Sequence, residues 1–249
     1  MSQIMPPLPA DEIHAIFQQT RNELSSSANN TAEIPTILAK PEKRIEHTLL
    51  KVDATDDMID RLCAVARAHA FRAVCCLPRH IEQCRAQLAE TEIKIVSVVD
   101  FPLCGSPPDD VAYLASSAIQ LGADEIDMVL DVNALKSRNL SAALHRIMLV
   151  TELSTHVPVK VILETACLTE EEIIIACAVC QAAGAAFVKT STGFTARGAS
   201  VRDIEVMKSA VGDTMRIKAS GGIKTADFAA ALIAAGADVI GTSNGPACM

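Results

Sequence analysis

The sequence predicts an α/β fold, a (β/α)8 TIM barrel, on two observations. From about residue 44 onward, short β-rich runs alternate with longer helical runs, and eight of the short runs occur. This alternation favours parallel strands joined by crossover helices. The core must also be built from Ala, Ile, Val and Leu, because the chain has no Trp and one Tyr, and such side chains are the usual filling of a parallel barrel.

The expected strands are the short apolar runs Ile45–Leu50, Ala73–Leu77, Ile93–Phe101, Glu125–Leu130, Val159–Glu164, Phe187–Ser191, Arg216–Ser220 and Val239–Thr242. The expected helices lie between them, at Asp56–His69, His80–Leu88, Asp109–Leu121, Leu140–Leu153, Thr169–Ala183, Val201–Val211 and Thr225–Ala235. Seven helices are one fewer than a barrel contains, so we expect the eighth helix to be missing or truncated. A doubly wound sheet is the alternative, but the Gly-rich turn of its dinucleotide-binding form does not follow Leu50.

Residues 1–42 differ from the rest and are expected to form an N-terminal extension of a barrel that spans residues 43–249. The extension carries three prolines near its start, one expected helix from Asp11 to about Leu24, and a polar linker from Ser25 to Thr31. A truncated eighth helix would leave an apolar flank on the barrel. We expect that flank to be covered by either the N-terminal helix or a partner subunit.

Charge and hydropathy argue against two classes of partner. The net charge of −8 disfavours general nucleic-acid binding, which needs a basic face. The most membrane-like stretch, Ile173 to Val188, is interrupted by Gln181 and Gly184 and is shorter than the ~20 residues of a spanning helix. We expect a buried helix, a turn and a strand there. The sequence thus predicts no nucleic-acid partner and no membrane partner.

The nine cysteines indicate reduced thiols in a cytoplasmic protein. Most lie within apolar patterns, and the N-terminus lacks the apolar segment of a signal peptide. Cys177 and Cys180 have a zinc-like spacing, but no second Cys or His pair accompanies them. We expect both to pack in the core, and no metal site is predicted.

Lys189 and Lys218 are the most informative residues of the chain. Each ends a short apolar run and is followed within four residues by Ser or Thr and then Gly. Barrel enzymes gather their active sites at the C-terminal ends of the strands, so the two amines are expected to meet in one pocket. Adjacent amines lower each other's proton affinity, and a neutral amine attacks carbonyls, which makes Schiff-base chemistry the leading hypothesis. The alternative for Lys189 alone is a surface lysine.

Further polar residues fall on the same strand ends and have two interpretations each. Asp127 lies inside an apolar strand, either as a catalytic group or as a structural partner of a Lys or Arg. Lys160 and Glu164 either face the site or pair with each other inside the barrel. His47 is expected to be a packed or capping residue and not a base.

Glycine-rich turns follow the last three expected strands. They are Thr192-Gly193, Gly221–Thr225 and Gly241–Gly245. Such loops, together with a helix N-terminus, form a recurrent phosphate site in barrels. The substrate would then carry a phosphate at one end and a carbonyl at the other.

The segments that carry these residues resemble one known family. They are Glu46–Leu50 with Asp53–Thr55, Val74-Cys75 with Pro78, Phe101–Leu103, Gly122–Asp127, Lys160–Thr165, Phe187–Gly193, Ile217–Ile223 and Gly241–Ser243. Taken in this order, over roughly residues 43–245, they strongly resemble the 2-deoxyribose-5-phosphate aldolases. That family consists of class I aldolases, which are metal-free Schiff-base enzymes of the (β/α)8 type.

The resemblance implies a mechanism and a set of residue roles. Lys189 would form the imine, Lys218 would keep Lys189 partly neutral, and Asp127 would move protons through a bound water. The reaction would be reversible cleavage of 2-deoxy-D-ribose 5-phosphate to acetaldehyde and D-glyceraldehyde 3-phosphate, with no cofactor and no metal. The implied substrate-binding residues are Thr48, Cys75, Lys160, Thr190, Gly193, Gly221, Gly222, Lys224, Gly241 and Ser243. The phosphate would be held by Gly193, Gly221, Gly222, Gly241 and Ser243, with Lys224 nearby as a charge partner. Cys75 would line the pocket without acting as the nucleophile.

The chain departs from the family pattern at a few points. Glu46 stands where the family commonly has Asp, Cys104 precedes Gly105 in the loop after the third strand, and Asn244 stands where a second Ser is often found. A C-terminal tail that some members use over the active site is not expected here. Two alternatives stay open: another class I aldolase acting on a different sugar phosphate, and a barrel that binds phosphorylated ligands or a partner protein with little catalysis. Family analogy suggests a homodimer.

Overall fold

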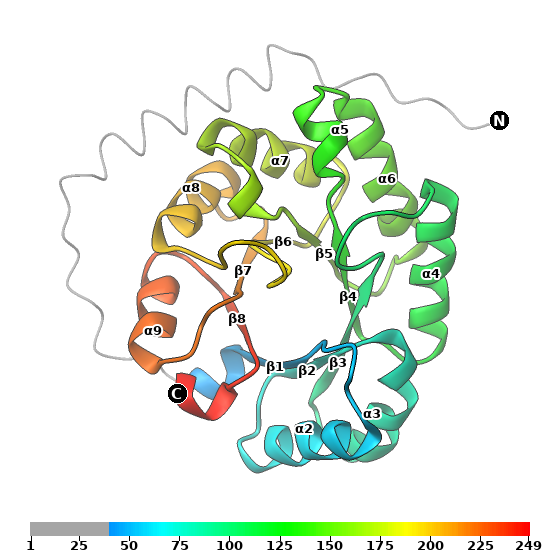
Figure 1. Cartoon of the computed structure of the whole chain (residues 1–249), viewed down its shortest axis with the longest axis vertical. Coiled ribbons are helices and arrows are strands. Elements are labelled where there is room, and N and C mark those ends of the chain that lie inside the picture. The colour runs from blue at the N-terminus through cyan, green and yellow to red at the C-terminus, as the bar shows by residue number, and fades with distance from the viewer. Residues whose placement is uncertain (1–39) are drawn as a thin grey trace.

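The computed structural model describes residues 40–249, which form a closed barrel of eight parallel strands wrapped by helices (Figure 1). Each strand pairs with the next along the chain, and β1 closes the barrel against β8. The strands are β1 Ile45–Leu49, β2 Ala73–Cys76, β3 Lys94–Val99, β4 Glu125–Val129, β5 Val159–Ile162, β6 Phe187–Lys189, β7 Arg216–Ser220 and β8 Val239–Thr242. The predicted barrel is thereby confirmed. The expected helix from Asp11 to Leu24 lies outside the described residues.

Three strands end two residues earlier than predicted. β3 stops at Val99 because Asp100 adopts a left-handed backbone with φ of 50°. β5 stops at Ile162, and Glu164 likewise has a positive φ of 56°. β6 stops at Lys189, although the backbone N–H of Thr190 still donates to Lys218 O at 3.1 Å. These strand ends are the positions where the chain leaves the barrel and turns into the loops of the C-terminal face.

The helices cover the outside of the barrel. They are α2 Asp56–Ala68, α3 Ile81–Leu88, α4 Pro108–Gln120, α5 Val132–Lys136, α6 Leu140–Leu153, α7 Glu170–Ala182, α8 Val201–Val211 and α9 Ala226–Ala234. Short 3-10 turns add η1 Pro41–Arg44, η2 Pro78–His80, η3 Thr165–Cys167 and η4 Gly245–Cys248. Seven of these helices match the prediction, and among the described residues η4 is the element that follows β8.

Helix α5 was not predicted. Its five residues are too few to show a helical period, which needs a window of at least 11 residues. The Asp131 carboxylate caps it by accepting from the Ala134 N–H at 2.8 Å.

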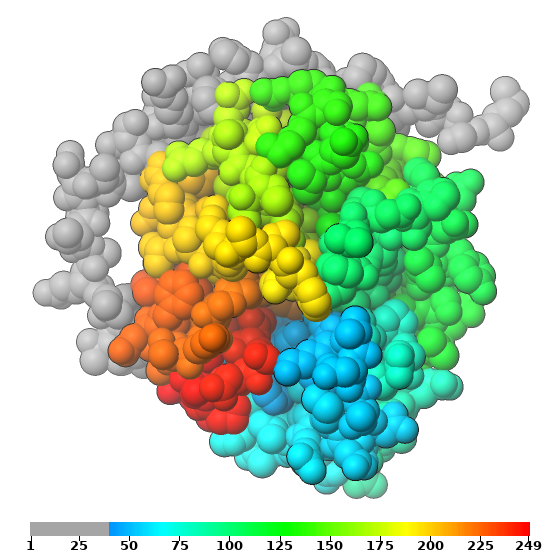
Figure 2. All heavy atoms as spheres, in the orientation of Figure 1, coloured from blue at the N-terminus to red at the C-terminus, as the bar shows by residue number. Residues whose placement is uncertain are grey.

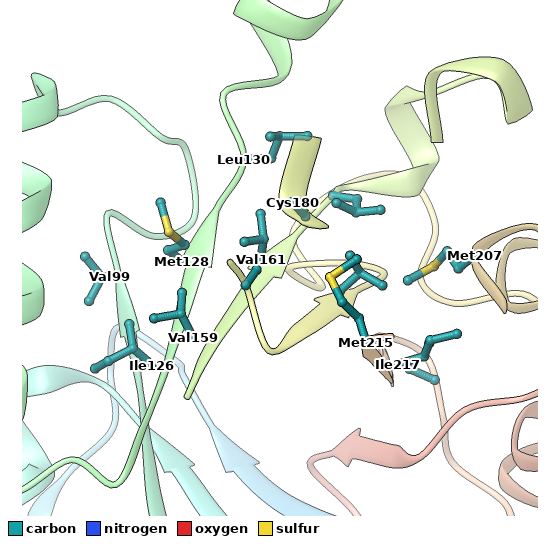
Figure 3. Packing of buried hydrophobic residues seen from close by; sticks show 14 of the residues in the cluster. Val99, Ile126, Met128, Leu130, Val159, Val161, Cys180, Met207, Met215 and Ile217 are labelled. Carbon is teal, nitrogen blue, oxygen red and sulfur yellow. The ribbon is translucent and has the colours of Figure 1, made fainter. Parts of the chain in front are cut away.

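The core lies between the strands and the helices that cover them (Figure 3). Helix α7 is apolar almost all round, and its residues Ile173 to Cys180 are all buried because it packs on the barrel and between α6 and α8. Cys177 and Cys180 are fully buried in this helix, which confirms their expected core packing. No helix within residues 40–249 is long and apolar enough to cross a membrane.

Candidate active site

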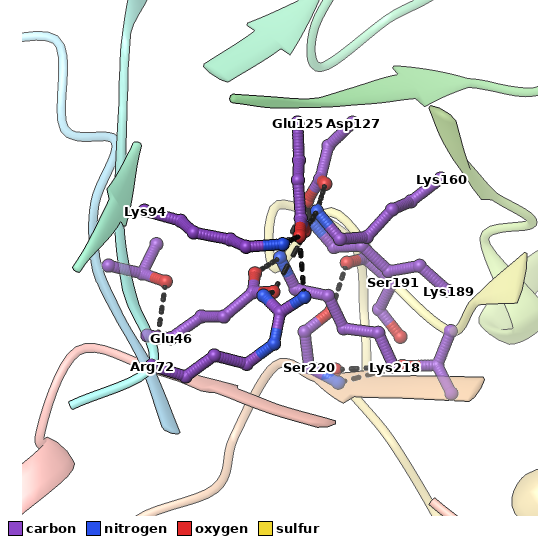
Figure 4. Close-up of polar contacts among 12 residues, drawn as sticks. Glu46, Arg72, Lys94, Glu125, Asp127, Lys160, Lys189, Ser191, Lys218 and Ser220 are labelled. Carbon is purple, nitrogen blue, oxygen red and sulfur yellow. Dashed lines mark hydrogen bonds and ion pairs between the residues drawn. The ribbon is translucent and has the colours of Figure 1, made fainter. Parts of the chain in front are cut away.

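Six charged side chains fill the interior of the barrel (Figure 4). They are Glu46, Glu125, Asp127, Lys160, Lys189 and Lys218, and each is at most 2% exposed. Charged groups this deeply buried are tolerated only when they are paired and hydrogen-bonded. Their mutual contacts therefore define what the interior can do.

The alternation of side chains along each strand brings these groups to the inside. Glu125 and Asp127 are two residues apart on β4 and so point to the same face. Across strands, Asp127 lies in register with Lys160, and Lys189 lies in register with Lys218. Residues from β4, β5, β6 and β7 thus converge without any contribution from a loop.

Lys189 and Lys218 meet at one carboxylate oxygen. Asp127 Oδ2 lies 2.8 Å from Lys189 Nζ and 2.7 Å from Lys218 Nζ. Asp127 Oδ1 lies 2.9 Å from Lys160 Nζ. Asp127 therefore accepts from three amines and fixes the relative positions of the two lysines that the sequence singled out.

A second set of contacts continues toward the N-terminal ends of the strands. Glu46 pairs with Lys218 and with Arg72, and Glu125 Oε2 lies 2.8 Å from Lys160 Nζ. Arg72 Nη2 lies 2.6 Å from Glu125 Oε1, and the half-exposed Lys94 reaches the same oxygen at 2.8 Å. We call Glu46, Arg72, Glu125, Asp127, Lys160, Lys189 and Lys218 the ionic column.

The three lysines of the ionic column differ in their proton affinities. Burial lowers the pKa of Lys189 below its ordinary value of 10.5; the nearby Asp127 opposes this, and the positive charge of Lys218 adds to it. Burial also acts on Lys218, but Asp127 and Glu46 outweigh it and raise the pKa of Lys218. In the same way, Asp127 and Glu46 raise the pKa of Lys160 against its burial. Lys189 is therefore the lysine that gives up its proton most readily.

Counting charges leads to the same lysine. The ionic column holds four cations and three carboxylates, so one positive charge is in excess when all are ionised. Lys189 contacts one carboxylate, whereas Lys218 contacts two. Loss of the Lys189 proton leaves three cations opposite three carboxylates. A buried cluster without net charge has the lowest electrostatic free energy.

Burial tends to raise the pKa of Asp127, but Lys160, Lys189 and Lys218 outweigh it and hold that pKa well below its usual range. Asp127 is thus ionised in the resting site. When Lys189 loses its proton, one of these three cations disappears. The proton affinity of Asp127 then increases.

A cavity of about 250 Å³ opens above Lys189 and Lys218 at the C-terminal ends of the strands. Figure 2 shows this face of the molecule, where loops after β1, β6, β7 and β8 surround the hollow. The cavity is lined by Thr48, Leu49, Leu50, Lys51, Lys189, Thr192, Gly193, Phe194, Lys218, Ser220, Gly221, Gly222, Ile223, Lys224, Gly241, Thr242 and Ser243.

Nine of the residues singled out by the sequence line the cavity. Besides Lys189 and Lys218 they are Thr48, Gly193, Gly221, Gly222, Lys224, Gly241 and Ser243. The structure therefore brings the two lysines and the glycine-rich turns to one cavity.

The other four lie below or beside the cavity. Asp127 and Lys160 lie beneath it in the ionic column. Cys75 is fully buried on β2, where burial raises the pKa of its thiol. The Thr190 hydroxyl donates to Ser220 O and accepts from Ser220 N, both at 3.0 Å, and so joins β6 to β7.

Two glycines are required by close approaches of neighbouring atoms. Gly221 has a φ of 88°, and a Cβ there would lie 2.9 Å from Gly198 Cα in the preceding loop. A Cβ on Gly241 would lie 3.0 Å from Lys218 Cε. Gly241 thus leaves the space through which the Lys218 side chain reaches Asp127.

Two alternatives drawn from the sequence are resolved by these contacts. Lys160 and Glu164 do not pair with each other, since Lys160 contacts Asp127 and Glu125 while Glu164 accepts from Thr192 and Thr195. His47 accepts from the backbone N–H of Gly245 at 3.4 Å, as expected of a capping histidine.

Sequence reasoning missed Arg72, Glu125, Lys51 and Phe194. A signal existed for Glu125, because its spacing of two from Asp127 on a strand predicts a shared inward face. Arg72 precedes β2, and nothing in its local sequence indicates that its guanidinium reaches Glu46 and Glu125. Within residues 40–249, no group of three His, Cys, Asp or Glu side chains is arranged to hold a metal ion.

Comparisons with known proteins identify the family of this chain. Residues 37–248 match the family model described as "DeoC/LacD family aldolase". The chain is 47% identical over 203 residues to a deoxyribose-phosphate aldolase of Brevibacillus brevis, covering 82% of this chain and 92% of the relative. It is 45% identical over 210 residues to a deoxyribose-phosphate aldolase of Streptococcus gordonii, covering 84% of this chain and 96% of the relative.

Solved structures are similar over most of the chain. A crystal structure described as a putative deoxyribose-phosphate aldolase from Coccidioides immitis has a TM-score of 0.86 at 31% identity and covers 97% of each chain. A tetrameric deoxyribose phosphate aldolase from Aeropyrum pernix has a TM-score of 0.79 at 28% identity, covering 94% of this chain and 95% of that one. On the strength of the family model and the relatives above 30% identity, this chain belongs to the DeoC/LacD aldolase family.

Proposed function

We propose that this protein cleaves 2-deoxy-D-ribose 5-phosphate reversibly to acetaldehyde and D-glyceraldehyde 3-phosphate through an imine on Lys189. One observation carries the proposal: Lys189 is the one lysine of the ionic column whose pKa lies below its ordinary value, because the nearby carboxylate does not outweigh burial, and its amine faces a cavity of about 250 Å³. A neutral amine that faces a substrate-sized space is the nucleophile of class I aldolases. The relatives named deoxyribose-phosphate aldolase support the choice of substrate.

The first stage forms the imine. The neutral Lys189 amine attacks C1 of the open-chain sugar to give a carbinolamine. One amine proton and one further proton then reach the C1 oxygen, which leaves as water, and the nitrogen keeps one proton, so an iminium forms. Asp127, 2.8 Å from Lys189 Nζ, is placed to take up and return protons through a bound water. Its proton affinity rises once Lys189 is neutral, which suits it to this exchange.

The second stage breaks the carbon–carbon bond. The electron pair of the C2–C3 bond moves into the iminium, which gives an enamine, while the C3 hydroxyl loses its proton and becomes the aldehyde of D-glyceraldehyde 3-phosphate. Protonation of the enamine carbon and hydrolysis then release acetaldehyde and free Lys189. Lys218 keeps its charge throughout, because Asp127 and Glu46 raise its pKa.

The phosphate would be bound at the opposite end of the cavity from the ionic column. Gly193, Gly221, Gly222, Gly241 and Ser243 all line the cavity and are the residues proposed to hold the phosphate. Their small side chains allow backbone N–H groups to approach an anion, and the N-terminus of α9 begins just beyond, at Ala226. Lys224 and Lys51 add positive charge at the rim.

Thr48 and Cys75 remain candidates for contact with the sugar, Thr48 at the cavity wall and Cys75 next to it on β2. Lys160 and Thr190 would act indirectly, because Lys160 is engaged by Asp127 and Glu125 and Thr190 by Ser220. A homodimer stays a prediction, which light scattering after size-exclusion chromatography will test.

Borohydride trapping tests the imine. Reduction in the presence of acetaldehyde is expected to attach a two-carbon group to Lys189, located by peptide mass mapping. A folded protein with no adduct, or with the adduct on another lysine, contradicts the proposal. Comparing the cleavage of 2-deoxyribose 5-phosphate with that of longer ketose phosphates distinguishes the proposed activity from that of another class I aldolase. Measuring activity in the presence of a chelator tests the expected independence from metal.

A further inference from the structure

The loop that joins β6 to α8 is held by a buried carboxylate outside the cavity lining. Glu164 follows β5, is 5% exposed and has a left-handed φ of 56°. Its carboxylate accepts from Thr192 N at 3.2 Å, from Thr195 Oγ1 at 2.9 Å and from the Thr192 hydroxyl. Arg197, the cation near it, pairs with Asp203 instead. A buried carboxylate without an ion pair depends on its hydrogen bonds, so Glu164 and these loop donors fix one another.

The same loop forms one wall of the cavity. Thr192, Gly193 and Phe194 all line it. Their positions follow from the Glu164 contacts, since two of the three donors belong to Thr192 and the third lies just beyond Phe194. Glu164 itself does not line the cavity.

A second attachment fixes the far half of the loop. Arg197 Nη2 donates to Thr165 O at 3.2 Å, and Thr165 Oγ1 donates to Asp203 Oδ2 at 2.9 Å. Both halves of the loop are therefore attached to the segment just after β5, at Glu164 and Thr165.

The loop in turn supports the glycine turn after β7. Ala199 N donates to Ser220 O and to Gly221 O, both at 3.1 Å. The two loops are in such close contact that a Cβ on Gly198 would lie 2.0 Å from Gly221 O. A shift of the β6–α8 loop therefore shifts Gly221 as well.

From these contacts we infer that Glu164 is a positioning residue: it sets the geometry of the phosphate-binding loops without touching the substrate. This rests on the proposed function, in which Gly193, Gly221 and Gly222 bind the phosphate. Lys189 is positioned independently, by β6 and by Asp127. Loss of Glu164 thus weakens binding of the phosphate end and leaves imine formation intact.

The experiment compares Glu164→Gln with the wild type on phosphorylated and unphosphorylated 2-deoxyribose. The amide keeps the volume but offers one acceptor oxygen where the carboxylate offered two, so contacts with Thr192 or Thr195 are lost. KM for 2-deoxyribose 5-phosphate is expected to rise about tenfold with kcat within about twofold, the scale of one lost buried hydrogen bond to a charged group. kcat/KM for unphosphorylated 2-deoxyribose and the rate of acetaldehyde trapping should not change. Glu171→Gln, an exposed glutamate of α7, is the matched control.

A second pair of variants covers the case in which Glu164→Gln does not fold. Thr195→Val removes one donor to Glu164, and Thr195→Ser restores the hydroxyl. The valine variant should raise KM for the phosphorylated sugar, and the serine variant should return it to the wild-type value. An equal KM for the two variants contradicts the inference, as does an equal loss of activity on both sugars.

Titration with inorganic phosphate separates this inference from the proposed function. If the wild type forms no adduct with acetaldehyde, the proposed chemistry fails, but weaker phosphate binding by folded Glu164→Gln or by Thr195→Val still supports the positioning role. Unchanged phosphate affinity in these variants overturns it whatever the outcome of trapping.

Discussion

β6 and β7 end in the same kind of side chain, yet the two lysines behave in opposite ways. Lys189 and Lys218 lie in register on neighbouring strands, are both buried, and contact the same oxygen of Asp127. Lys218 also pairs with a second carboxylate, that of Glu46, whereas Asp127 is the one carboxylate that pairs with Lys189. Burial lowers the pKa of Lys189, while Asp127 and Glu46 outweigh burial and raise the pKa of Lys218. The number of anions within reach, and not burial alone, decides which of the two amines loses its proton more readily.

The largest expected effect comes from removing the amine itself. Lys189→Ala should lower kcat/KM by at least about 10⁴-fold, since the covalent route then disappears. Steady-state cleavage of 2-deoxyribose 5-phosphate measures the loss, and borohydride trapping should give no adduct. Lys208→Ala, which removes an exposed lysine on α8, should retain full activity. Near wild-type activity in Lys189→Ala would refute the assignment.

Lys218→Leu addresses the comparison directly. Without this neighbouring cation the pKa of Lys189 rises, because Lys218 contributes to lowering it. The rate depends on neutral Lys189, so it should fall by about 10²-fold at neutral pH, and its increase with pH should shift to higher pH. The check is a pH–rate profile of kcat/KM. Lys218→Arg, which keeps the charge, should shift the profile less, and a profile unchanged in Lys218→Leu contradicts the role given to Lys218.

Glu125→Gln tests the lower part of the ionic column, where stability should respond more than chemistry. Burial raises the pKa of Glu125, but Lys160 and Arg72 outweigh it and bring that pKa below its ordinary value of 4.5. The ionised carboxylate therefore stabilises the fold above pH 4.5, and this contribution is lost as the pH falls toward the folded-state pKa. The substitution should lower the free energy of unfolding by about 3 kcal/mol at neutral pH, because Lys160 and Arg72 lose a partner.

Urea unfolding at several pH values measures this effect. The wild type should lose stability below pH 4.5 more steeply than Glu125→Gln, so that the two curves converge in acid. Two parallel curves would show that Glu125 does not carry the pH dependence.

The smallest effect is expected from Gly241→Ala. The new Cβ would lie 3.0 Å from Lys218 Cε, so the lysine must shift by a few tenths of an ångström and its contacts with Asp127 and Glu46 lengthen. A decrease in kcat of about tenfold is expected, on the scale of a small misplacement of a site group. Gly105→Ala is the matched control, because a Cβ there meets no atom within 4 Å. Equal kcat in the two variants would show that Gly241 is not needed for the placement of Lys218.

Much of the site follows from local sequence. The alternation of strands and helices predicts the barrel, and the barrel places Lys189 and Lys218 at the same end of neighbouring strands. The period of two along β4 puts Asp127 on an inward face together with Glu125. The glycine turns after β6, β7 and β8 are visible as sequence patterns, and the structure places them around one cavity.

The chain's own sequence thus determined the fold and the two strands whose lysines meet inside the barrel, because both depend on a period that a few neighbouring residues reveal. It did not determine the proton affinities. Those depend on Glu46, which reaches Lys218 from a position 172 residues earlier in the chain, and on Arg72, which approaches from the start of β2. Electrostatic energy depends on distances through space, and only the closed barrel brings these charges within a few ångströms of one another.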